Sequence, residues 1–489
     1  MAAKRRVKQG RVPGESGRRV PARNPTAPGG RAPAGPAGEG SSGPPRPIRD
    51  DLVRALVLEA YGAIRDEGRV ADRTLDYLLR REKRLYANER RAVAEAVYGL
   101  LRAEGRLTYL LEESLGDELR ALSSAAKRAL FYEALRVQER RIPPARALAE
   151  GGLSAALLPG LVACAAPGEL LSRLSEDPAK RLAVAESLPP WMAELFLREL
   201  DEEGAFALAR SMNERAPLTI RMNGLRTDRE TLIARLASEG VEAKATSWSP
   251  DGLHVDGRQN LFRLRSFEEG LFEIQDEGSQ VLARLLDPHP GWLVVDSCAG
   301  AGGKTLALAA SMKNRGRLVA LDTDERRLGM LGPRARRAGV HNWESHVVPA
   351  DGLPTPLAEK LGDRADAVLI DAPCTGLGVL RRNPDARFRL DEGSVQRFAG
   401  IQKELLARYA ALAKPGGRIV YATCSIATEE NEGVVETVLA EHPELELMPP
   451  ATTLGEELAE RLGARRYLKL LPHVHGTDGF FAALLRRRA

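Results

Sequence analysis

A predicted strand that runs directly into a glycine-rich turn and then a helix constrains the fold of this chain most. Residues 292–297 (WLVVDS) suit a buried strand, residues 298–305 read CAGAGGKT, and a helix is predicted over 306–312. In such a unit the backbone can approach a ligand closely at the helix N-terminus. The unit therefore predicts a ligand site in an α/β fold.

Three kinds of site use a turn of this kind. A phosphate-binding P-loop requires a first glycine at position 298, where this chain has Cys, although Gly303-Lys304-Thr305 fits the end of the motif. A dinucleotide site requires a third glycine at position 305, where this chain has Thr. The third kind is the S-adenosylmethionine site of a class I methyltransferase, whose turn admits the methionine part of the cofactor.

Acidic residues downstream favour the third kind of site. Asp322, Asp351 and Asp371 each end or follow a predicted strand. The carboxyl ends of parallel strands meet at the ligand edge of an open α/β sheet, so these acids are expected at one edge. There Asp322 can accept both ribose hydroxyls and Asp351 can reach the adenine amine. The strands predicted in this region are 292–297, 317–322, 345–350, 367–371, 418–422 and 480–485.

Cys374 and Cys424 follow two of these strands, and the ends of those strands are predicted to be neighbours or nearly so. The pair could form a regulatory disulfide or bind a metal. However, the chain has no CxxC spacing and the nearby His residues lack metal-ligand spacing, so no metal is predicted.

The chemistry that uses such a pair is methylation of a pyrimidine at C5. A thiolate that adds to C6 makes C5 an enamine-like carbanion, which takes a sulfonium methyl group, and the C5 proton must then be removed. Asp371 is placed to stabilise the activated ring and to select cytosine over uracil. The base must be single-stranded or extruded to be reached.

The N-terminal half divides by composition. Residues 1–48 hold ten Lys and Arg against two Glu, with nine Pro and nine Gly, and are predicted to form a disordered basic tail. That tail carries +8, so the rest of this chain of net charge +5 carries −3. Helical periodicity predicts an all-α domain over 49–165, with a basic edge at Arg80, Arg81, Lys83 and Arg84. Residues 166–270 suit a small α+β module, with strands at 217–223 and 252–256 and a helix over 228–239, before the α/β domain at 271–489.

Composition excludes two classes of protein. Four cysteines in 489 residues cannot form a disulfide scaffold, so a reducing interior is expected. Apolar runs fall far short of the ~18 residues that span a membrane. We therefore expect a cytoplasmic protein without a membrane segment.

These motifs resemble the NOL1/NOP2/Sun family of RNA cytosine-C5 methyltransferases, in particular its small-subunit ribosomal RNA branch, Fmu or Sun. The similar stretches are DSCAGAGGKT, LDTDE, ADG, LIDAPCTGLGVLRRNPDARFR, YATCSIATEENEGVV and HGTDGFFAALLRR, with MNGLRT and FEIQDEGSQ before them. Residues 49–165 are similar to the family's NusB-like RNA-binding domain. The family's usual turn reads CAAPGGKT; here Gly300-Ala301 replaces Ala-Pro, which should loosen the turn.

The resemblance implies a class I Rossmann-like fold and a role for each matching residue. The family's nucleophile is the Cys of its TC motif, here Cys424, and the PC cysteine, here Cys374, assists release of the product. Spacing alone does not choose between them, because DNA cytosine-C5 methyltransferases attack with a Pro-Cys thiol. S-adenosyl-L-methionine would be held by Cys298, Ala299, Gly300, Ala301, Gly302, Gly303, Lys304, Asp322, Asp351 and Asp371.

We predict an S-adenosylmethionine-dependent RNA cytosine-C5 methyltransferase that acts on 16S ribosomal RNA as a monomer. Arg381, Arg382 and Arg387 are the candidate contacts to the RNA backbone, and the basic tail should add salt-sensitive affinity. One alternative is a tRNA cytosine-C5 methyltransferase. Another is a non-catalytic RNA-binding ribosome assembly factor, although such a scaffold would need neither cysteine.

Overall fold

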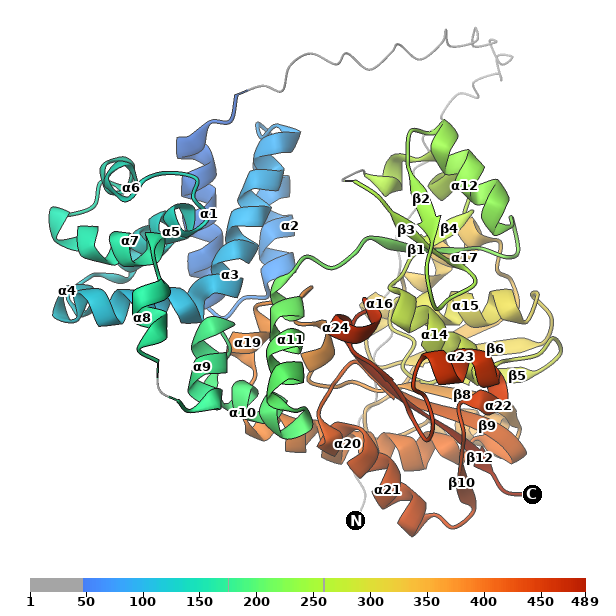
Figure 1. The fold of residues 1–489 in the computed structure, drawn as a ribbon. Coiled ribbons are helices and arrows are strands. Elements are labelled where there is room, and N and C mark those ends of the chain that lie inside the picture. Colours follow the sequence, from blue (N-terminus) through green and yellow to red (C-terminus); the bar gives the residue numbers. More distant parts are fainter. Residues whose placement is uncertain (1–46, 175, 258–259) are drawn as a thin grey trace, which may run out of the picture. The chain divides into compact units, whose positions relative to one another are not determined.

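The protein is represented by a computed structural model that describes residues 47–174, 176–257 and 260–489 (Figure 1). The predicted tail, residues 1–48, lies outside the described residues except for Pro47 and Ile48. From Ile48 onward the chain forms one compact unit. Within the described part of the chain, no helix combines the length and the apolar character needed to cross a membrane.

Helices alone make up the described chain between residues 50 and 172. The long helix α3 contacts α1, α5 and α7, and the interface between these helices buries Val57, Leu100, Leu111, Leu130 and Leu161 completely. The helices are α1 (Asp50–Arg65), α2 (Ala71–Arg81), α3 (Ala87–Leu115), α4 (Asp117–Arg120), α5 (Ser124–Gln138), α6 (Pro144–Gly151), α7 (Leu158–Ala165) and α8 (Gly168–Ser172).

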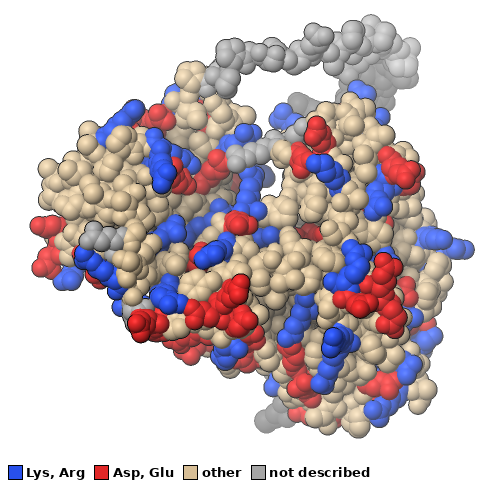
Figure 2. Space-filling view, viewed as in Figure 1, with Lys and Arg blue, Asp and Glu red and all other residues tan. Residues whose placement is uncertain are grey.

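The basic edge expected in this helical region is largely neutralised. Arg80 pairs with Asp76, Arg81 with Glu59 and Arg84 with Glu82. Figure 2 likewise shows acidic and basic side chains interspersed on the face that it displays. Charge in this region therefore forms ion pairs and does not accumulate as one basic surface.

Three more helices precede a small antiparallel sheet. They are α9 (Pro178–Ala185), α10 (Pro190–Glu199) and α11 (Glu202–Asn213). The sheet has the strand order β2-β3-β1-β4. The predicted strands at 217–223 and 252–256 and the predicted helix at 228–239 correspond to β1, β3 and α12, each slightly shorter than expected. The elements of this module are β1 (Thr219–Met222), α12 (Arg229–Ser238), β2 (Ala243–Ala245), β3 (Gly252–Val255) and β4 (Phe272–Ile274).

A larger sheet carries the glycine turn, with the strand order β10-β12-β9-β8-β5-β6-β7 and β11 paired to β12. Strands β5 to β9 pair in parallel, as the alternation of strands and helices predicts. The strands are β5 (Leu293–Asp296), β6 (Arg317–Asp322), β7 (Trp343–Val347), β8 (Ala365–Asp371), β9 (Ala413–Thr423), β10 (Leu445–Met448), β11 (Leu468–Leu470) and β12 (Phe480–Arg487).

Two features of this sheet differ from the prediction. Strand β12 is antiparallel to β9, and it lies between β9 and β10. Strand β7 begins at Trp343 and ends at Val347, whereas the sequence predicted 345–350. It ends early because Pro349 has no amide hydrogen to donate to a neighbouring strand.

Both faces of the sheet are buried, because the side chains of each strand alternate between two cores. Val294, Leu318 and Leu369 face α14 (Glu277–Leu286), α15 (Gly303–Ser311) and α17 (Leu331–Ala338). Val295, Val319 and Val368 face α20 (Gly393–Ala410) and α21 (Glu432–Glu441). This explains why the strands read as continuous apolar runs. Only the ends of the strands are left to bear polar chemistry.

Candidate active site

The glycine turn between β5 and α15 depends on two glycines with positive φ. Gly300 has φ +54° and Gly302 has φ +84°. A Cβ added to Gly302 would lie 2.3 Å from Leu331 Cδ1, and one added to Gly300 would lie 2.8 Å from Arg327 Nη2. Both residues adopt the positive φ that favours glycine, so backbone is the main surface that the turn offers a ligand.

The acids predicted to surround a cofactor follow the strand order. The order β7-β6-β5-β8 places Asp351, Asp322, Cys298 and Asp371 successively along the carboxyl edge of the sheet. Asp322 Oδ2 accepts a hydrogen bond from Gly300 N at 2.6 Å, so the acid braces the turn directly. Asp351 lies in an exposed turn after β7.

Lys304 and Asp371 form an ion pair next to the turn, with Nζ and Oδ2 2.7 Å apart. Burial on its own lowers the pKa of Lys304, but the charge and hydrogen bond of Asp371 together with the nearby Asp296 and Cys424 raise that pKa overall. Lys304 therefore stays charged and fixes the Asp371 carboxylate at the end of β8. Burial also raises the pKa of Cys298 to about 12, so this thiol stays protonated and is not a nucleophile.

Asp296, which ends β5 beneath the turn, is fully buried. Its Oδ2 accepts a hydrogen bond from Thr305 Oγ1 at 2.6 Å, and burial raises the pKa of its carboxyl to about 7. Asp296 thus ties the strand to the first turn of α15.

The two cysteines meet at the ends of adjacent strands. Cys374 follows β8 and Cys424 follows β9, and Asp371 pairs in register with Ala422. The Sγ atoms of the two cysteines lie 3.2 Å apart, and both residues are free thiols that are partly exposed. A hydrogen bond to Cys424 and burial together raise the pKa of Cys374 well above that of a free thiol. Cys374 therefore keeps its proton and can donate it to Cys424.

A buried carboxylate that the sequence analysis did not single out holds the two cysteine loops together. Glu430 Oε1 accepts hydrogen bonds from Thr375 N and from Gln402 Nε2, both at 2.9 Å. Its Oε2 contacts Thr375 Oγ1 and Ser425 Oγ, the neighbours of the two cysteines. Burial raises the pKa of Glu430, and hydrogen bonds from Ser425 and Thr375 oppose that effect. Residues 427–432 (ATEENE) belong to one of the stretches that resemble the family. The sequence alone does not show which of its three glutamates is buried between the cysteine loops.

The arginines predicted to contact RNA do not form an exposed group. Arg387 is 1% exposed and donates to Asn213 Oδ1 at 2.7 Å and to carbonyl oxygens of the helical region. Arg381 is 5% exposed and its Nε donates to Asp478 Oδ1 at 2.6 Å. Burial puts both guanidinium groups out of reach of a phosphate, so the prediction is wrong for these two residues.

Arg382 is partly exposed, but its guanidinium group forms ion pairs with two aspartates. It pairs with Asp478 and with Asp276, the latter at 3.0 Å. Residues 381–387 therefore contact both the helical region and the segment 476–478. No group of three or more His, Cys, Asp or Glu residues that could hold a metal ion occurs among the described residues.

Two known protein families match two consecutive parts of the chain. A family described as 16S rRNA methyltransferase RsmB/F matches residues 283–486. A second, described as Methyltr_RsmF/B-like, ferredoxin-like domain, matches residues 188–261, which include the small antiparallel sheet.

Individual proteins agree with these matches. The chain is 32% identical over 416 residues to a probable ribosomal RNA small subunit methyltransferase B of Synechocystis, covering 82% of this chain and 91% of the relative. It is 35% identical over 333 residues to the 28S rRNA (cytosine-C(5))-methyltransferase of Mus musculus, covering 65% of this chain and 41% of the relative. The crystal structure of PH0851 superposes with a TM-score of 0.70 and 28% identity, covering 90% of this chain and 99% of that one.

Proposed function

Because the chain belongs to the 16S rRNA methyltransferase RsmB/F family, we propose that it methylates cytosine C5 in 16S ribosomal RNA. The observation that carries the proposal is the pair of thiols 3.2 Å apart beside Asp371. Among common reactions of nucleic-acid bases, C5 methylation of a pyrimidine needs a nucleophilic thiol and a second group that acts on the adduct. The name of the mouse relative, a cytosine-C(5) methyltransferase, points to the same carbon.

The residues at the edge of the sheet fit S-adenosylmethionine. The turn around Gly300 and Gly302, both with positive φ, leaves backbone to face a ligand. Asp322 ends β6, where a carboxylate can accept ribose hydroxyls, and Asp351 follows β7, near the expected adenine position. When bound, the cofactor supplies a methyl group attached to a positively charged sulfur.

In the proposed reaction the Cys424 thiolate forms a bond to C6 of the target cytosine. The electrons of the C5–C6 double bond then become available at C5, which acquires the methyl group. Asp371, held by Lys304, accepts a hydrogen bond from the exocyclic amine of cytosine. Uracil carries a carbonyl oxygen at that position, which the carboxylate repels, and this repulsion selects cytosine.

Release of the product requires loss of the C5 proton and cleavage of the bond between Cys424 Sγ and C6. Cys374 lies against Cys424 and keeps its own proton, so it can donate to the departing thiolate. Cys374 takes up the C5 proton in exchange for the proton that it donates, and the electrons of the broken C5–H bond restore the C5–C6 double bond as Cys424 leaves as a thiol. The proposal also holds that the protein acts as a monomer in the cytoplasm.

Bisulfite sequencing tests the substrate. Ribosomal and transfer RNA from cells that lack the gene should lose methylation at a cytosine of 16S RNA. Wild-type protein should restore it, and Cys424→Ala should not. Loss of methylation only in transfer RNA, or in no RNA, would overturn the proposal.

A further inference from the structure

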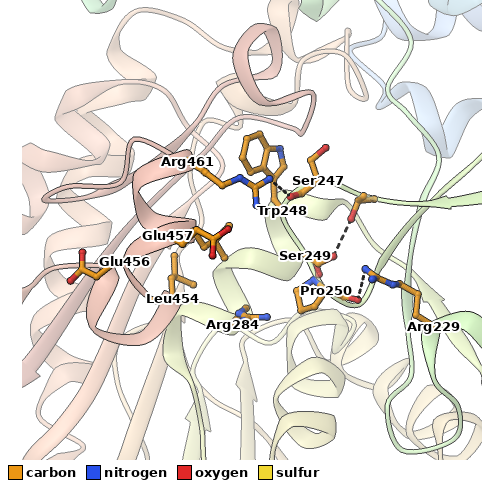
Figure 3. A pocket seen from close by; sticks show the side chains of 13 residues that line it. Arg229, Ser247, Trp248, Ser249, Pro250, Arg284, Leu454, Glu456, Glu457 and Arg461 are labelled. Atoms are coloured by element: carbon orange, nitrogen blue, oxygen red, sulfur yellow. Dashed lines mark hydrogen bonds between the residues drawn. The ribbon is translucent and has the colours of Figure 1, made fainter.

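A cavity of about 460 Å³ lies outside the catalytic edge of the sheet. Its walls are the N-terminus of α12, the β2–β3 connection, α14, α22 (Ala451–Leu454) and α23 (Glu456–Arg461). Three arginines from three different elements line it: Arg229, Arg284 and Arg461 (Figure 3). A cavity of this volume falls in the range that accommodates small ligands or part of a larger one.

Each of the three arginines can donate hydrogen bonds into the cavity. Arg229 Nη1 donates to Pro250 O at 3.2 Å and Arg461 Nη2 donates to Ser247 O at 3.0 Å, which leaves the other guanidinium hydrogens of both residues available. The guanidinium of Arg284 is exposed and makes no hydrogen bond or ion pair with any of the described residues. The cavity therefore presents a planar donor group, suited to phosphate, on several sides.

Two carboxylates limit the positive charge. Glu456 and Glu457 also line the cavity, so the five charged lining residues sum to +1, and Asp251 lies close enough to Arg284 and Arg229 to interact with their charges. In Figure 3 Glu456 lies away from the three guanidinium groups. This balance suits a single phosphodiester group better than a dense polyanion.

An aromatic ring is fixed beside the arginines. Trp248 Nε1 donates to His475 O at 2.8 Å, and Glu277 accepts hydrogen bonds from the amides of Trp248 and Ser249. The half-buried ring has Arg461 5.3 Å from its centroid. Aromatic side chains next to phosphate-binding arginines form the usual platform for bases of single-stranded RNA.

One short segment joins this cavity to the catalytic cysteines. His475 contacts Trp248 at one end of the segment, and at the other end Gly479 N donates to Gly378 O at 2.8 Å. Gly378 N in turn donates to the carbonyl oxygen of Cys424 at 2.9 Å. Residues 475–479 thus connect the aromatic wall of the cavity to the loop beside Cys424.

We infer that the cavity binds one nucleotide of the RNA strand that flanks the target cytosine. Its phosphate contacts the arginines, with Arg284 as the main contact, and its base lies against Trp248. The inference rests on the proposed function, which identifies RNA as the substrate, and it names a contact away from the reacting atoms.

Binding of the full-length protein to single-stranded RNA, followed by fluorescence anisotropy, tests the inference. Arg284→Glu should raise the Kd about tenfold at low salt and lower the slope of log K against log salt by about one, because a phosphate contact is lost. Arg284→Gln should have a smaller effect in the same direction. In methyl transfer, Arg284→Glu should raise KM for RNA and leave kcat at saturating RNA within about twofold of wild type.

Arg315→Glu is the matched control. Arg315 is an exposed arginine just before β6, at the edge of the sheet opposite to the one that carries Asp322 and Asp371. The charge change is the same as in Arg284→Glu. An equal loss of affinity in the control, or no loss in Arg284→Glu, overturns the inference. Calorimetry with inorganic phosphate gives a second test. If phosphate binds the wild type but not Arg284→Glu, and the two proteins bind RNA with equal affinity, the cavity binds phosphate but not RNA and the inference is overturned. Wild-type protein that binds RNA without forming 5-methylcytosine would refute the proposed reaction and leave this comparison of affinities valid.

Discussion

Glu430 accepts a hydrogen bond from the backbone amide of Thr375 at 2.9 Å, across 55 residues of sequence. Thr375 immediately follows Cys374, and Ser425, which also contacts Glu430, immediately follows Cys424. This single buried carboxylate therefore ties together the two loops that carry the cysteines.

Replacing Glu430 with Ala should separate the two loops. The buried donors of Thr375 and Gln402 would lose their acceptor, which should lower the free energy of unfolding by about 1–3 kcal/mol. The rate of methyl transfer in a single turnover should fall, while cofactor affinity measured by calorimetry should stay within about twofold, because the cofactor turn lies on other strands. Glu430→Gln, which keeps one acceptor oxygen, should recover part of the rate. A variant with normal turnover would show that Glu430 has no positioning role.

The two cysteines should behave differently when each is removed. Cys374→Ala should accumulate a covalent RNA–protein adduct, because the thiol that assists release is gone. Cys424→Ala should give neither adduct nor turnover. A shifted band on a denaturing gel distinguishes the two variants, and the reverse pattern would assign the attack to Cys374.

Asp296 should make stability depend on pH. Burial raises its pKa to about 7 in the folded protein, compared with about 3.9 in an unfolded chain. Between these values the folded state binds the additional proton, so this group lowers the free energy of unfolding as the pH rises from about 4 to 7.

Urea unfolding of wild type and Asp296→Asn at a series of pH values checks this effect. The difference in free energy of unfolding between the two proteins should change across that range and level off above it. A difference that is constant with pH would mean that the carboxyl of Asp296 titrates normally.

Arg387 should matter for folding and not for RNA contact. Arg387→Ala would leave a cavity and unpaired carbonyl oxygens, and should lower the free energy of unfolding by roughly 2–4 kcal/mol. The RNA affinity of the protein that remains folded should match the wild type. Arg315→Ala serves as the exposed control, with little effect on either measurement. A selective loss of RNA affinity in Arg387→Ala would contradict the buried role.

The turn and the strand ends were predictable because their signals are local. The run WLVVDS before CAGAGGKT specifies a strand, a turn and a helix by itself, and the strand-ending positions of Asp322 and Asp371 follow from the same pattern. The approach of Cys374 to Cys424 needed only the expectation that their strands are neighbours in a parallel sheet.

Residues that act through distant partners were not predictable in the same way. Arg381 and Arg387 resemble a solvated basic run, since Asp478 and Asn213, which bury them, lie 97 and 174 positions away. Glu430 is one of several glutamates in ATEENE, and only the fold selects it as the acceptor for both loops. The pairing of β12 between β9 and β10 likewise depends on contacts that no local pattern records.

That pairing has a consequence for when the enzyme becomes active. Strand β12 lies between β9 and β10 and pairs with both, and Gly479, just before it, donates a hydrogen bond to Gly378 in the loop beside Cys424. During synthesis, the catalytic centre cannot be completed until residues 480–487 have left the ribosome exit tunnel. A chain from which residues 480–487 have not yet emerged therefore lacks the strand that pairs with β9 next to Cys424.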